Sequence, residues 1–196
     1  MSAIGFLATP ESDAAAQRIF EEDMTELGYV MNVSKLWAYQ PATLTHLFEL
    51  MGETHAQQTL SFRQRGILVT ACASTLGDAY CSLAWGAKLA ARYDAETAAG
   101  VLRGDDDRLS PDEQAMARWA RKVARGPNHT TDADVQELRD AGFSEAHIFA
   151  MTAYVALRIA FSTVNDALGA RPDAALRSTA PEAVLEAVAY GRPIDD

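Results

Sequence analysis

The chain has 196 residues, of which 48% are apolar and 22% are charged, and its formal net charge is −10. These values indicate one folded domain over residues 1–196 and exclude a chain that is disordered as a whole. The acidity argues against nucleic acid or a membrane surface as a partner, because their negative charges would repel the protein. No basic start followed by an apolar run opens the sequence, and the longest apolar stretch, 148–161, is too short to span a bilayer, so we expect a cytoplasmic protein.

Helical spacing of apolar residues runs along nearly the whole chain. The predicted helices cover residues 12–27, 41–56, 61–76, 78–92, 94–103, 111–125, 132–141, 145–161 and 181–190. Period-two alternation rich in β-branched residues is missing, so we predict no strand. The expected fold class is all-α, and residues 191–196 are expected to form a loose tail.

Residue types at the helix ends support these boundaries. Ser61 with Gln64, and Ser110 with Glu113, have the spacing of a capping box, in which two side chains satisfy free backbone N–H groups at a helix start. Pro111 stands at the first position of its helix, where its missing N–H costs nothing.

The predicted helix 145–161 is apolar almost all round, which is typical of a helix at the centre of a fold. Arg158 interrupts this pattern. Because an unpaired buried charge is costly, we expect the Arg158 side chain either to reach the surface or to meet a carboxylate.

The segment from Gly77 to Trp85 carries the candidate chemistry. Gly77 ends one predicted helix, and Asp78 is a favourable N-cap for the next. Cys81 then occupies the third helical position, where the helix dipole favours a thiolate, although an ionised Asp78 works against it. Alternatively, Cys81 is a small residue packed under Trp85, since cysteine is often buried as a plain hydrophobe.

Asp78 also has two interpretations. Either it only caps the helix, or it is a carboxylate at the mouth of a pocket, able to take or give a proton. Trp85 and Tyr80 would wall that pocket, and His147, at the start of the apolar helix, is a further candidate for it. The aromatic residues can equally belong to the core.

Cys72 lies on the apolar face of the predicted helix 61–76, which favours a place in the core. Whether it approaches Cys81 stays open. Two cysteines are too few for a disulfide scaffold in a chain of this length.

We expect no metal and no cofactor. A Gly-x-Gly-x-x-Gly or Walker-type phosphate loop does not occur, nor does His-Glu-x-x-His. No i, i+4 pair of metal-binding type is formed by the four histidines, which are His46, His55, His129 and His147.

The order and spacing of several segments resemble the alkylhydroperoxidase D / carboxymuconolactone decarboxylase family, mostly its peroxidase-related branch. Residues 28–41 resemble the family's entry segment, and residues 60–86 resemble its redox segment. Residues 132–149 resemble a characteristic helix pair, and residues 165–169 its closing segment. The resemblance covers about residues 25–172 and implies an all-α helical bundle that assembles as a homotrimer or homohexamer.

In the family, the redox segment carries a glutamate, then Cys-x-x-Cys, then a histidine four residues on. By this resemblance Asp78 stands at the first cysteine, Cys81 at the second, Trp85 at the histidine and Gly66 at the glutamate. Because a dithiol cycle needs two adjacent sulfurs, we do not expect that cycle here.

Three functions therefore stay open. The first is binding or transformation of a small organic molecule in a pocket near Asp78, Cys81 and Trp85, with Asp78 as acid or base. The second is a single-cysteine peroxidase that uses Cys81, with Cys72 or an external thiol to resolve it. The third is a non-catalytic oligomeric scaffold. The resemblance implies that an enzyme of this type would be a peroxidase-like oxidoreductase or a decarboxylase-like lyase.

Overall fold

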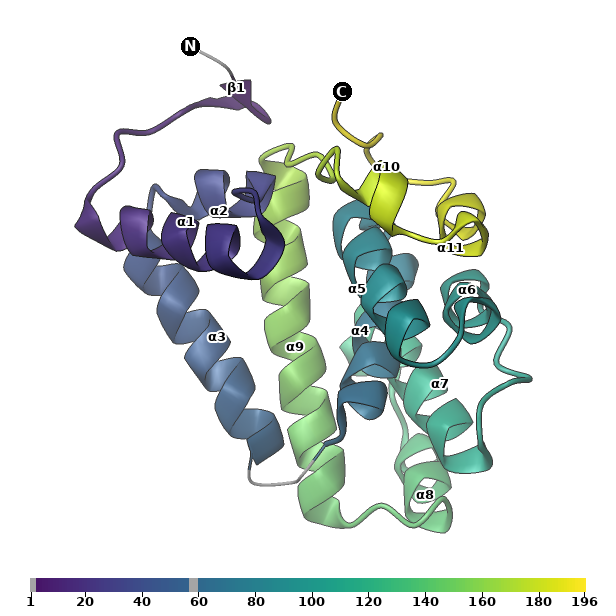
Figure 1. Ribbon diagram of the computed structural model, residues 1–196. Coiled ribbons are helices and arrows are strands. Elements are labelled where there is room, and N and C mark those ends of the chain that lie inside the picture. Colours follow the sequence, from purple (N-terminus) through teal and green to yellow (C-terminus); the bar gives the residue numbers. More distant parts are fainter. Residues whose placement is uncertain (1–2, 57–59) are drawn as a thin grey trace.

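The computed structural model describes residues 3–56 and 60–196, and helices form nearly all the regular structure in these ranges (Figure 1). The predicted all-α class is therefore confirmed. The helices are α1 (Ala14–Leu27), α2 (Asn32–Trp37), α3 (Pro41–Ala56), α4 (Phe62–Leu76), α5 (Ala79–Arg92), α6 (Ala95–Arg103), α7 (Pro111–Arg125), the 3-10 turn η1 (Pro127–His129), α8 (Asp132–Asp140), α9 (Glu145–Ala167), α10 (Leu176–Thr179) and α11 (Glu182–Ala187).

The long helix α9 runs through the middle of the molecule (Figure 1). It packs against α3 on one side and against α4 and α7 on the other. Helices α1 and α2 cross one end of the α3–α9 pair, whereas α11 packs on α6 and α5. Helix α8 lies at the opposite end, beside α7.

Helix α4 forms the centre of the core, because its residues 66–73 are all buried between α5, α7 and α9. Ile67, Leu68 and Val69 are 0–1% exposed. Burying each of these side chains stabilises the fold by about 1.5–3 kcal/mol relative to leaving it in water.

The predicted caps are present. Gln64 N donates to Ser61 Oγ at 3.2 Å, and Ser61 N donates to Gln64 Oε1 at 2.9 Å, which is the complete capping box of α4. Ser110 and Glu113 form the same box at the start of α7, with Pro111 at its first position.

Four short elements escaped the prediction: the helices α2 and α10, the 3-10 turn η1, and a two-stranded antiparallel hairpin of β1 (Ala3–Ile4) and β2 (Leu7–Ala8). The expectation of no strand was therefore wrong. Gly5 turns the hairpin at φ +65°, and a Cβ there would lie 2.3 Å from the carbonyl oxygen of Leu168. Strands of two residues are too short to produce a periodic signal.

Helix α9 ends at Ala167, six residues beyond its predicted end. By length and composition it is the one helix in the described ranges that could cross a membrane. A core helix of a soluble protein passes the same test, and α9 is packed on both sides by other helices, so this property is weak evidence for a membrane span.

The segment 191–196, expected to be loose, makes defined contacts. Asp195 N donates to the carbonyl oxygen of Pro172 at 2.8 Å, and the Asp195 carboxylate pairs with Arg171 at 3.1 Å. Arg171 also donates to the carbonyl oxygen of Ile194 at 3.2 Å. These contacts hold the segment against the loop that follows α9.

Candidate functional site

Asp78 is the N-cap of α5, as the sequence predicted. Its Oδ1 accepts a hydrogen bond from Cys81 N at 2.9 Å. Its Oδ2 accepts one from Ser162 Oγ, on α9, at 2.5 Å. The carboxylate is fully buried, so it does not lie at the mouth of a pocket.

The segment after α11 covers the turn that holds Asp78. Tyr190 donates from its hydroxyl to Ser82 Oγ at 3.0 Å. Gly191 follows at φ +72°, and a Cβ there would lie 2.5 Å from the carbonyl oxygen of Gly77 and 2.9 Å from Ala79 N. This close backbone approach keeps water away from the start of α5.

Cys81 occupies the third position of α5, as predicted, and is buried. Its Sγ lies 3.3 Å from Arg158 Nη2, which donates toward the sulfur, and 3.8 Å from Ser162 Oγ, whose proton is donated to Asp78. Burial and then the charge of Asp78 raise the pKa of Cys81, whereas Arg158 lowers it. Burial dominates, so the thiol form prevails and the helix start does not produce a resting thiolate.

Arg158 meets neither of the two expectations from the sequence. It is 4% exposed and forms no ion pair within residues 3–56 and 60–196. Its guanidinium lies instead between two sulfur atoms, with Met51 Sδ at 3.9 Å, and against the rings of Trp85 and Phe161, at 5.6 and 5.1 Å from their centroids. Its Nε is buried without a hydrogen-bond partner.

We call Asp78, Cys81, Arg158 and Ser162 the inner cluster. The contribution of α9 to it was missed in the sequence, although a signal exists. Arg158, Ser162 and Asn165 follow each other at i, i+4 and i+7 in an apolar helix, so they share one face. All three are buried, and Asn165 Oδ1 accepts a hydrogen bond from Trp37 Nε1 at 2.8 Å.

Cys72 is buried in α4 and unpaired, like Cys81. Burial raises the pKa of Cys72 to about 12; Arg158 lowers it and Asp78 raises it. Both thiols therefore lie in the field of the same two charged groups, and neither is poised as a thiolate at neutral pH.

The other predicted pocket residues lie in different places. Tyr80 is buried, and its hydroxyl donates to Asp173, which is not part of the inner cluster. Trp85 stacks on Phe62 at 5.7 Å, and its ring centroid lies 5.6 Å from the Arg158 guanidinium of the inner cluster. His147 bonds to Ser144 at the start of α9, and fifteen residues of helix, about 22 Å, separate it from Ser162, so it does not join the site.

None of the five best-formed pockets in the described part of the chain is lined by Asp78, Cys81 or Trp85. One pocket adjoins the inner cluster through Phe161, and we call it the Phe161 pocket. It has a volume of about 730 Å³ and is lined by side chains of α1, α2 and α3, including Ile19, Val33, Leu44 and Phe48. The Phe161 ring stacks on Trp37 at 5.8 Å and separates the pocket from Arg158.

No group of three or more metal-binding side chains occurs among the described residues.

No family model matches the chain, and no curated protein matches it significantly. Solved structures do. An uncharacterised peroxidase-related protein from Silicibacter sp. TM1040 superposes with a TM-score of 0.78 at 22% identity, over 91% of this chain and 96% of that one. A peroxidase-related protein from Ralstonia eutropha JMP134, described as an alkylhydroperoxidase AhpD core, gives 0.74 at 22% identity, over 90% and 96%.

The debrominase Bmp8 is similar as well. Its cysteine-to-alanine variant in complex with 2,3,4-tribromopyrrole superposes with a TM-score of 0.72 at 19% identity, over 93% of this chain and 97% of that one. Because nearly the whole of each chain is matched, the protein has the alkylhydroperoxidase D-like fold, as the sequence resemblance predicted.

Proposed function

We propose that the protein is a peroxidase-related member of the alkylhydroperoxidase D-like family that binds a small, uncharged organic molecule in the Phe161 pocket and does not run a dithiol cycle. The observation that carries the proposal is the position of Phe161. The Phe161 side chain lines the pocket, and its ring centroid lies 5.1 Å from the Arg158 guanidinium. A bound molecule would therefore be one aromatic ring away from the inner cluster.

The character of the pocket supports this ligand class. Its volume of about 730 Å³ lies within the range of small-molecule sites, and its walls are mainly apolar. Glu22, Glu26 and Glu49 stand exposed around it and outnumber the cation Arg18, so the charge of the lining disfavours an anionic ligand. The debrominase of the same fold holds a small brominated pyrrole, which suggests a ring of that size.

The inner cluster would then offer polar contacts rather than a resting nucleophile. Arg158 has a buried Nε without a partner, which a hydrogen-bond acceptor on a ligand can satisfy if Phe161 moves. Asp78 already accepts from Cys81 N and Ser162, so a role as acid or base requires that these bonds rearrange.

Isothermal titration with 2,3,4-tribromopyrrole and with pyrrole tests the proposal. Ala42 lines the pocket, whereas Ala133 lies exposed on α8 and lines none of the five pockets. Ala42→Trp should weaken binding about tenfold or more by filling the pocket, and Ala133→Trp should leave it unchanged. Absence of binding to the native protein, or equal binding by both variants, would refute the proposal.

A second candidate function is peroxidase chemistry by Cys81 alone. It is favoured by the 3.3 Å contact from Arg158 Nη2 to the sulfur, since a guanidinium stabilises a thiolate. Cys81 would attack the peroxide O–O bond, giving a sulfenic acid and an alcohol, and Cys72 or an external thiol would resolve it. Burial of both sulfurs makes this the weaker candidate.

The thiol candidate has its own test. Alkylation by iodoacetamide should be slow for Cys81 and Cys72 at pH 7, and cumene hydroperoxide should be consumed no faster than by Cys81→Ser. Rapid alkylation of Cys81 together with peroxide turnover that Cys81→Ser abolishes would establish the second candidate instead.

We also propose, from the resemblance, that the protein assembles as a homotrimer or homohexamer in the cytoplasm. Phe149 is 77% exposed and Leu50 is 49% exposed, and both line an apolar groove between α3 and α9. Light scattering coupled to size-exclusion chromatography would give the assembly size, and a monomer would contradict this proposal.

A further inference from the structure

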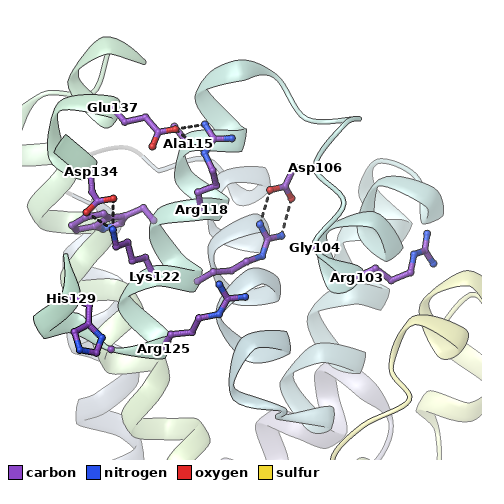
Figure 2. Close-up of a pocket in the computed structure, with 13 residues that line it drawn as sticks. Arg103, Gly104, Asp106, Ala115, Arg118, Lys122, Arg125, His129, Asp134 and Glu137 are labelled. Atoms are coloured by element: carbon purple, nitrogen blue, oxygen red, sulfur yellow. Dashed lines mark hydrogen bonds and ion pairs between the residues drawn. The ribbon is translucent and has the colours of Figure 1, made fainter. Parts of the chain in front are cut away.

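A second pocket, which we call the α7 pocket, opens on the other side of the molecule and shares no lining residue with the Phe161 pocket. Its volume is about 770 Å³. Figure 2 shows that its side chains come from the end of α6, the outer face of α7, the turn η1 and helix α8. Five of them are cationic in a chain whose net charge is −10: Arg103, Arg118, Arg121, Lys122 and Arg125.

Four of these cations form a stripe on α7. Arg118, Arg121, Lys122 and Arg125 follow at i, i+3, i+4 and i+7, so they share one face of the helix. The stripe is a local cluster of positive charge in a chain whose overall charge is negative.

Three cations of the stripe are neutralised by acidic side chains (Figure 2). Arg118 pairs with Glu137, and Lys122 pairs with Asp134 at 2.6 Å. Arg121 forms a two-pronged pair with Asp106 at 2.6 and 2.8 Å. The paired groups fix the walls of the pocket.

Arg103 and Arg125 remain without an ion pair among the described residues. Both are exposed and line the same pocket from the last turns of two different helices. A helix C-terminus favours a cation, but that preference does not require two such ends to line one concave surface. The pocket therefore keeps an excess of two positive charges.

The pocket has a rigid floor. Arg121 is 8% exposed and also donates to the carbonyl oxygen of Val101 at 3.0 Å, which ties α7 to α6. Trp119, 7% exposed, lines the bottom and donates its Nε1 to Thr152 on α9 at 3.0 Å. A site of this kind holds its two free guanidinium groups on supported helices rather than on a mobile loop.

We propose that the α7 pocket binds a small organic phosphate, with Arg103 and Arg125 as the groups that recognise its charge. A phosphate monoester carries about two negative charges at neutral pH, which matches the excess in the pocket. The guanidinium group offers paired donors that fit phosphate oxygens. The volume leaves room for an organic portion over Trp119 and Ala115.

Isothermal titration with glycerol 3-phosphate tests this assignment, with succinate and glycerol as comparison ligands. Arg103→Gln and Arg125→Gln should each weaken glycerol 3-phosphate binding about tenfold, because each removes a charge-assisted contact. The matched control Arg108→Gln removes an exposed positive charge that does not line the pocket, and it should change binding less than about twofold. Thermal unfolding of each variant verifies that it is folded.

Each of several outcomes would overturn the proposal: no binding of glycerol 3-phosphate by the native protein at about 10 mM, unchanged binding by the double variant R103Q/R125Q, or an equal loss in R108Q. Binding of succinate as tight as that of glycerol 3-phosphate would overturn the phosphate assignment. None of these results depends on the Phe161 pocket.

Discussion

The inner cluster and the α7 pocket each contain a buried arginine, and the two are compensated in different ways. Arg121 is 8% exposed, and its guanidinium is bonded to both carboxylate oxygens of Asp106 and to a backbone carbonyl. Arg158 is 4% exposed and has two sulfur atoms and two aromatic rings around it, with no ion pair in the described ranges.

This difference separates a structural arginine from one whose charge is still available. The charge of Arg121 is used to join α7 to the end of α6, and its geometry leaves little for a ligand. The guanidinium of Arg158 contacts polarisable groups and forms no ion pair in the described ranges, so its charge can act on a thiol or on a bound molecule. Burial alone does not identify a functional arginine; the nature of its partners does.

The largest effect is expected when the compensation of Arg121 is removed. Asp106→Ala leaves a buried guanidinium without its carboxylate and should lower the free energy of unfolding by about 3–5 kcal/mol. Urea denaturation measures this change in the free energy of unfolding. Asp107→Ala, which removes the exposed neighbouring carboxylate, should change it by no more than about 0.5 kcal/mol. Equally small losses in both variants would contradict a structural role for the Asp106–Arg121 pair.

The inner cluster depends on Asp78, the carboxylate that holds its two helices together. Asp78→Ala removes an N-cap and a buried hydrogen bond from Ser162, so a loss of about 2–3 kcal/mol is expected. Asp94→Ala is the matched control, since Asp94 caps α6 in an exposed position, and it should cost about 1 kcal/mol. Equal losses in urea denaturation would mean that the contact with Ser162 adds nothing to the cap.

Arg158→Met tests the contrast with Arg121 directly. The substitution leaves no carboxylate unpaired, and Met fills a similar apolar space. The free energy of unfolding should therefore change by less than about 1.5 kcal/mol in either direction. Iodoacetamide should label Cys81 more slowly than in the native protein, because Arg158 lowers the pKa of that thiol. A loss as large as that of Asp106→Ala would show that Arg158 is structural as well.

The smallest effect concerns Asp166, beside the inner cluster. Burial, and next the charge of Asp78, raise the pKa of Asp166 to about 6. A raised pKa stabilises the fold below about pH 4, and this contribution is lost as the pH rises through 6. Asp166→Asn should therefore raise Tm at pH 8 by at most about 2–4 °C, since the group is partly exposed, and leave it unchanged at pH 4. An equal shift at both pH values would contradict the titration of Asp166.

The parts of the site that depend on neighbouring residues could be predicted from the sequence. Asp78 as an N-cap and Cys81 at the third helical position need only the Gly77 stop and local capping chemistry. The partner of that turn could not, because Ser162 lies 84 residues away in the chain and meets Asp78 only through packing of α9 on α4 and α5. The alkylhydroperoxidase D-like fold could also be predicted, because the order and spacing of several segments resemble that family.

Two expectations failed for a related physical reason. The helix was predicted to end at residue 161, but Ser162 and Asn165 point inward and find partners, and α9 continues to Ala167. His147 was a candidate for the pocket because it opens the apolar helix, but it lies at the opposite end of α9 from Ser162. Helical spacing shows which face of a helix a residue lies on. It does not show which other helix packs against that face at that point along the axis.

The buried polar stripe of α9 also has a consequence for how the helices align. Ser162 meets Asp78 of α5, and Asn165 meets Trp37 of α2, on the same helix face. A slide of α9 by one residue would break both hydrogen bonds and leave four buried groups unsatisfied at once. A purely apolar helix surface tolerates such shifts more easily, so these few polar atoms single out one register from several that pack almost equally well.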